Sequence, residues 1–168
     1  MNIIVALDDN VTSKTIIDFL SLELYENASF RLIHVVNPMM VNEHPLIAYA
    51  PFLEPAEDEY MLQANELLIS SAEKLHKAIG AHNVINADVL IGIPSSILVK
   101  QAKEWPADLI VVGSHGRSGI EQLLLGSVSR EIVSQSPCSV MVVKIGKRQL
   151  TETTSSSQTH LNVSGPAG

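Results

Sequence analysis

The sequence predicts a single three-layer α/β/α domain in which helices cover a mostly parallel β-sheet. Short β-branched and aliphatic runs alternate along the chain with longer stretches whose apolar residues recur about every 3.6 positions. This alternation predicts five strands separated by four helices, an order typical of parallel sheets covered on both faces. The chain has 168 residues, of which 46% are hydrophobic, so it can form one domain with a full core but not two domains of ordinary size.

The first strand, the first helix and the second strand follow one another within the first 36 residues. A β-branched run begins at Ile3 and stops at Asp8, and a second run, RLIHVV, covers residues 31–36. Between the two runs, Thr12 or Ser13 can cap a helix, because each side chain can accept a hydrogen bond from an amide of the first turn. The predicted apolar face of this helix consists of Ile16, Ile17, Phe19, Leu20 and Leu24.

A long loop and a long helix are predicted next. Residues 37–56 contain four prolines together with methionines and aromatic residues, a pattern typical of a long loop, and long loops in compact domains are often functional. Apolar residues at helical spacing then predict a helix over 61–79, which Gly80 can terminate. Residues 84–91 are predicted to form the third strand.

The second half of the chain continues the alternation. After Pro94, Ser95 or Ser96 is predicted to cap a short helix that ends near Trp105, and residues 128–133 are predicted to form the last helix. The four-residue apolar runs 109–112 and 140–143 suit strands that are buried on both faces. The domain is expected to cover residues 1–146, and the polar, low-complexity tail 147–168 is expected to be disordered.

The charge and the cysteine content limit the cellular compartment and the classes of partner that are expected for this protein. The chain carries 11 Lys and Arg against 18 Asp and Glu, and the net charge of −7 weighs against a general affinity for nucleic acid or acidic membranes. The single cysteine, Cys138, cannot form an internal disulfide, and the first apolar run is too short for a signal peptide or a membrane span. These features predict a cytoplasmic protein without membrane insertion.

The candidate ligand-binding residues lie in the segment VVGSHGRSGIEQLLLGSVSREIV. In it a buried strand leads into several glycines, and Gly126-Ser127 then begins a helix. Glycine allows backbone amides to approach a ligand closely, and a helix N-terminus attracts anions, so the combination suits a phosphate chain. Arg117 can supply a full positive charge. The segment is neither a P-loop nor a dinucleotide fingerprint, because it has no Gly-Lys-Ser/Thr and does not follow the first strand.

The spacing Gly113-x2-Gly116-x9-Gly126-Ser127 resembles the G-2x-G-9x-G-(S/T) motif of the ATP-binding universal stress proteins. IIVALDDN resembles the first strand of that family, RLIHVV its second strand and SPCSVMVVK its closing strand, so the resemblance covers about residues 1–145. It implies a five-stranded parallel sheet in the order 3-2-1-4-5, of the adenine nucleotide alpha hydrolase-like type. That order places the ligand crevice between strands one and four, where Asp8 and Gly113 would line one cleft.

The resemblance also implies a role for each matching residue. Asp8 would lie near the ribose or the base, and the backbone at Val35 would pair with adenine. The phosphates of ATP would be held by Gly113, Gly116, Gly126, Ser127 and Val128. His115 lies inside the glycine loop, where it can either contact phosphate or face solvent.

Metal binding is left open by the sequence. Asp9-Asn10 replaces the Gly-Ser or Phe-Ser that is common in the family, and a second carboxylate would repel phosphate unless it points away or meets a cation such as Mg²⁺ or Mn²⁺. The six histidines show no paired ligand spacing, which argues against a zinc site.

Three functions are compatible with the sequence. The first is a regulatory, stress-response module that binds ATP without turnover, with no catalytic residue assigned. The second is a slow ATP hydrolase or phosphotransferase, and the third is a protein that binds a partner protein without nucleotide. The last strand, from Val140 to Val143, would lie at a sheet edge, so a homodimer through it is expected, as the resemblance also implies.

Overall fold

A single parallel sheet organises the computed structural model, which describes residues 1–8, 10–37, 55–114 and 125–144. Its strands are β1 (Asn2–Ala6), β2 (Ser29–Val36), β3 (Val84–Ile91), β4 (Leu109–Gly113) and β5 (Ser139–Val143). They lie in the order β3-β2-β1-β4-β5, and every neighbouring pair is parallel. The predicted order 3-2-1-4-5 is therefore confirmed, with β5 at one edge.

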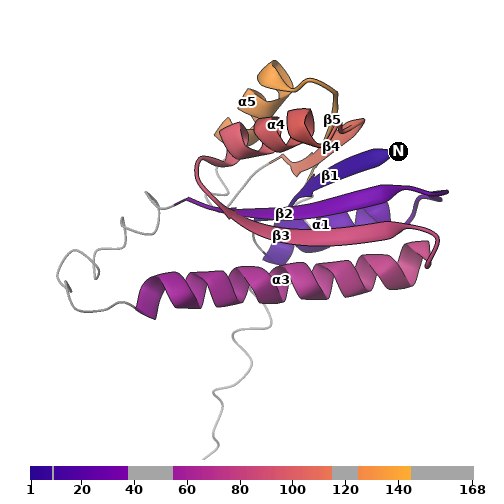
Figure 1. Ribbon diagram of the computed structural model, residues 1–168, viewed down its shortest axis with the longest axis horizontal. Helices are drawn as coiled ribbons and strands as arrows, with labels where there is room; N and C mark the ends of the chain where they lie inside the picture. Colours follow the sequence, from indigo (N-terminus) through magenta and orange to yellow (C-terminus); the bar gives the residue numbers. More distant parts are fainter. Residues whose placement is uncertain (9, 38–54, 115–124, 145–168) are drawn as a thin grey trace, which may run out of the picture.

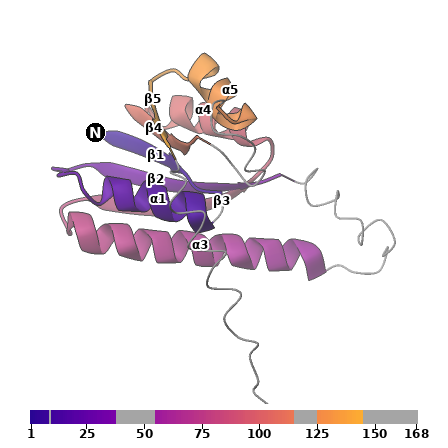
Figure 2. The same cartoon turned by 180° about the vertical axis from the view of Figure 1, so that it is seen from behind.

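Helices cover both faces of the sheet (Figure 1). The helices α1 (Asn10–Leu20) and α3 (Pro55–Ile79) pack on one face, and α4 (Pro94–Glu104) and α5 (Ser127–Gln135) pack on the other. The reverse view shows α1 and α3 side by side beneath the strands (Figure 2). The predicted three-layer α/β/α architecture is thus present in the described residues.

Two apolar clusters fill the spaces between these layers. Alternate residues of one strand face opposite layers, so Ile3 packs in the cluster under α1 and α3 while Ile4 packs in the cluster under α4 and α5. Phe30 is fully buried in the first cluster, and its ring meets that of Tyr25 edge to face, with centroids 5.0 Å apart. Burial raises the pKa of Tyr25, and the nearby charge of Glu23 raises it further.

The predicted limits of the first helix are wrong at both ends. The helix begins at Asn10, so Thr12 and Ser13 lie inside its first turns and do not cap it. It ends at Leu20, and Leu24 is 99% exposed in the following turn. Periodicity alone suggested a longer apolar face, but an 11-residue helix already spans a five-residue strand, so further leucines have no sheet to pack on.

Proline sets the start of two other helices. Pro94 is the first residue of α4, and Ile93 precedes it without any side-chain cap, so the predicted capping by Ser95 or Ser96 is wrong. Pro55 likewise begins α3, inside the stretch predicted to be loop. Proline suits the first helical position because its φ is already helical and it has no amide hydrogen to leave unpaired.

The remaining predicted boundaries agree closely with the structure. Gly80 has a φ of +78° and follows the last residue of α3, which confirms it as the helix terminator. The helix α5 extends two residues beyond the predicted end at 133 and begins one residue earlier, at Ser127. The predicted tail, 147–168, lies outside the described residues.

Candidate functional site

A cavity of about 390 Å³ lies at the carboxyl ends of the strands. Its walls come from the end of β1, the end of β2, the turn before α4, the end of β4 and the start of α5. The strand order reverses between β1 and β4, and such switch points leave a crevice outside the carboxyl ends of a doubly wound sheet. The cavity therefore occupies the place that the topology predicts, and its volume is that of a small-molecule pocket.

The structure brings six of the predicted site residues to this one cavity. They come from four separate segments of the chain: Asp8, Val35, Gly113, Gly126, Ser127 and Val128. The other three predicted residues, His115, Gly116 and Arg117, lie outside the described residues, as does Asp9. Their proposed contacts with a ligand stay predictions.

One end of the cavity is formed by the N-terminus of α5. Gly126 is the N-cap of this helix and provides no side-chain cap, while the Gly126 amide donates to the carbonyl of Ser114 at 2.9 Å. The first amides of a helix have no acceptor within the helix, and they carry a partial positive charge. Ser127 is exposed and lines the cavity beside these amides, so this end suits an anion such as phosphate.

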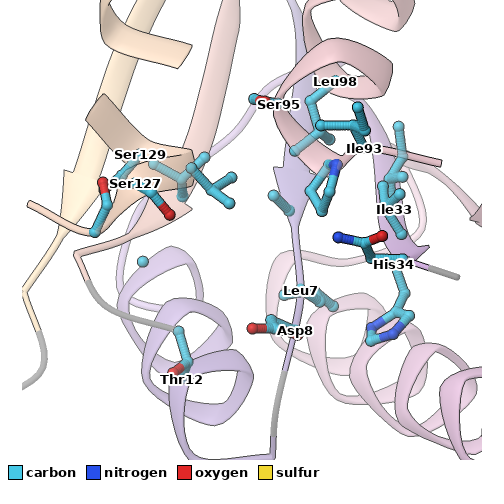
Figure 3. A pocket seen from close by; sticks show the side chains of 18 of the residues that line it. Leu7, Asp8, Thr12, Ile33, His34, Ile93, Ser95, Leu98, Ser127 and Ser129 are labelled. Atoms are coloured by element: carbon cyan, nitrogen blue, oxygen red, sulfur yellow. The ribbon is translucent and has the colours of Figure 1, made fainter. Parts of the chain in front are cut away.

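The opposite side of the cavity is apolar. Figure 3 shows Ile93 and Leu98 on the side away from Ser127, and Ile33, Val35 and Pro94 line the cavity as well. The turn between β3 and α4 is held by Gly92, whose amide donates to the carbonyl of Val36 at 3.0 Å. Gly92 has a φ of +147°, and a Cβ there would lie 3.0 Å from Ile97 Cγ1. This tight turn places an apolar wall where a planar base could pack.

Comparison with known proteins identifies the family. The sequence model described as the universal stress protein family matches residues 1–144. The chain belongs to the universal stress protein family. Universal stress protein A homolog 2 of Coxiella burnetii is 34% identical over 143 residues, a match that covers 83% of this chain and 90% of the relative.

Solved structures of similar fold include proteins with bound nucleotides. MJ0577 of Methanocaldococcus jannaschii matches with a TM-score of 0.72 and 21% identity, over 87% of this chain and 96% of that one. An Arabidopsis thaliana universal stress protein family member with AMP bound has a TM-score of 0.60 and 18% identity, with coverage of 89% and 94%. Other universal stress proteins have been solved with cAMP and, from Archaeoglobus fulgidus, with dAMP. These matches show that this universal stress protein has the adenine nucleotide alpha hydrolase-like fold.

The charges at the cavity of this universal stress protein are unequally distributed. Two carboxylates, Asp8 and Glu131, line it, and none of the described lining residues is Lys or Arg. An anion in this part of the cavity must therefore rely on backbone amides and hydroxyls for binding.

Among the described residues, no three His, Cys, Asp or Glu side chains are grouped so that they could hold a metal ion. In the same part of the chain, no helix is long and apolar enough to cross a membrane.

Several cavity residues of the universal stress protein were not predicted from sequence. Ser95 is 2% exposed, and its hydroxyl donates to Glu131 Oε2 at 2.7 Å. Thr12 and His34, both buried, also line the cavity. A signal for Ser95 was present, because it lies four residues after the end of the third predicted strand, and carboxyl ends of parallel strands meet at one edge. Glu131 follows Ser127 by one helical turn, which places both side chains on one face of α5.

Proposed function

We propose that this universal stress protein binds ATP in the cavity between β1 and β4 and acts as a nucleotide-dependent regulatory module in a stress response. Six of the predicted site residues, from four segments of the chain, converge on one cavity, and this convergence is the main support for the proposal. That AMP, cAMP and dAMP occur in structures of similar fold supports an adenine nucleotide as the ligand. The triphosphate is inferred from the glycine spacing of the sequence.

Each part of the proposed ligand has a matching part of the cavity. The base would pack on the apolar side formed by Val35 and Leu98, and the phosphates would lie at the N-terminus of α5, near Gly126 and Ser127. Asp8 would accept from the ribose, because its carboxylate points into the cavity between these two ends (Figure 3). Gly113, Val128, and the loop residues His115, Gly116 and Arg117 would complete the phosphate site.

The contacts described above account for the binding of a ligand. A regulatory module requires affinity for ATP without its turnover. Where Mg²⁺ or Mn²⁺ accompanies the phosphates, we expect Asp8 to bind it, because its carboxylate lines the cavity and oxygen ligands suit these cations. Steady release of ADP in the presence of Mg²⁺, lost in Asp8→Ala, would favour the alternative of a slow hydrolase.

The proposal is tested by asking which nucleotide the purified protein carries. Denaturation should release an adenine nucleotide, identified by chromatography and mass spectrometry. After the nucleotide is stripped, ATP at about a hundred times its Kd should raise the Tm by about 5 °C or more, because binding to the folded state alone stabilises it. Inorganic tripolyphosphate is the control, since it lacks the base. No released nucleotide together with no shift by ATP would leave only the partner-binding alternative.

We also propose a homodimer formed through β5. This strand is an edge of the sheet, and Val140, Met141 and Val142 are only half-buried in the single chain. Edge strands with apolar side chains favour pairing with another chain. Size-exclusion chromatography with light scattering at micromolar concentration should give about twice the chain mass of 18.2 kDa. A mass of one chain at that concentration would contradict the dimer.

The cellular location is part of the proposal. Cys138 is the single cysteine of the sequence, and it is half-buried against the apolar cluster under α4 and α5. An unpaired, packed thiol is suited to a reducing compartment, so we place the protein in the cytoplasm.

A further inference from the structure

We infer that Ser95 selects adenine over 6-oxo purines, because its hydroxyl is fixed as a hydrogen-bond acceptor toward the cavity. This inference rests on the proposed binding of ATP and adds a specificity-determining residue to it. The pair of Ser95 and Glu131 lies outside the glycine motif and joins α4 to α5 across the cavity wall.

Ser95 Oγ lies 2.7 Å from Glu131 Oε2 and donates to it. The second carboxylate oxygen, Oε1, accepts from Gln135 Nε2 at 3.2 Å, which helps to hold the carboxylate in place. A serine hydroxyl has one proton and two lone pairs, and bonds to a carboxylate are stronger than bonds between neutral groups. With its proton directed to Glu131, Ser95 can only accept from a ligand.

Ser95 lies in the wall of the cavity. It follows Pro94 in the first turn of α4, it is 2% exposed, and it lines the cavity. Figure 3 shows it beside Leu98, and its hydrogen bond to Glu131 places it between the apolar side of the cavity and α5. Because the Glu131 carboxylate beside it would repel a phosphate, the group that Ser95 meets is expected to be an edge of the base. The backbone here has little freedom, since proline fixes φ at the preceding residue.

Purine bases differ in the group that they carry at position 6. Adenine carries an amino group at position 6, which donates hydrogen bonds, whereas hypoxanthine and guanine carry a carbonyl oxygen there, which accepts them. A buried acceptor that faces a carbonyl leaves both groups without a donor, and such unsatisfied groups are costly. The Ser95 oxygen should therefore favour a 6-amino purine.

The test compares ATP with inosine triphosphate, which replaces the 6-amino group by a carbonyl. Isothermal titration of the nucleotide-stripped full chain should show about tenfold tighter binding of ATP, the effect of roughly one hydrogen bond. Ser95→Ala should reduce this preference to under about threefold, mainly by weakening ATP binding. Glu131→Gln should also reduce it, because an amide can donate to Ser95 and free the serine proton for a carbonyl.

The matched control is Ser96→Ala, at the neighbouring serine, which is exposed and does not line the cavity. It should keep the preference for ATP unchanged. Circular dichroism should show that all three variants remain folded. If the unaltered protein binds both nucleotides equally, or if Ser95→Ala keeps the full preference, the inference is overturned while nucleotide binding stands. If neither nucleotide binds the unaltered protein, the proposed function fails and the inference fails with it.

Discussion

Ser127→Glu is expected to weaken ATP binding at least about a hundredfold. The substitution places a negative charge where the phosphates are proposed to lie, and two like charges about 4 Å apart repel by roughly 4 kcal/mol near a protein surface. Ser127 is exposed and is the first residue of α5, where a carboxylate is favourable to the helix, so the fold should be preserved. Isothermal titration with ATP measures the change.

Ser134→Glu is the matched control for this charge. Ser134 is an exposed serine on the same helix, and it does not line the cavity. Its substitution adds the same charge to the protein but should change ATP affinity by less than about threefold, because exposed charges at a distance are screened by salt. Equal affinity in the two variants would refute the assignment of phosphate to the N-terminus of α5.

Phe30→Ala is expected to lower the free energy of unfolding by about 3–5 kcal/mol. Phe30 lies on β2 with no exposed surface, in the apolar cluster under α1 and α3, and its edge-to-face contact with Tyr25 would also be lost. A domain of this size has a total stability of about 5–15 kcal/mol, so the loss is a large share of it. Urea unfolding followed by circular dichroism measures the difference.

Phe19→Ala removes the same side chain from a surface position. Phe19 is 37% exposed at the end of α1, so its loss should cost clearly less than that of Phe30, about 1–2 kcal/mol. A similar loss in the two variants would mean that the exposed face of α1 is covered in solution, contrary to the packing described for the single chain.

The strands could be predicted from the sequence because β1, β4 and β5 each contain a short, continuous apolar run, and β2 and β3 are rich in β-branched and aliphatic residues. Their order could not be predicted from periodicity, which carries no information on which strands are neighbours, and it came from the resemblance to a family. Helix ends were less predictable. Leu24 continues the apolar rhythm of α1, yet the sheet is too short to cover it. Pro94 begins α4 before the serines that were expected to cap it.

The candidate site was predictable where it depends on local sequence. The glycine spacing indicated Gly113, Gly126 and Ser127, and all three line the cavity. The hydrogen bond between Ser95 and Glu131 joins residues 36 positions apart, on two helices whose contact is decided only by tertiary packing. Neither residue belongs to a motif, so their pairing could not be predicted from the sequence.

NMR spectroscopy of the ¹⁵N-labelled, nucleotide-free protein measures whether ATP occupies the cavity between β1 and β4. On addition of ATP, the amide signals of Gly113, Ser127 and Val128 should shift and saturate together. The signals of Leu22 and Leu24, in the turn between α1 and β2, should stay unchanged, since this turn does not line the cavity. Saturable shifts confined to other surfaces, or no shifts at millimolar ATP, would contradict the account.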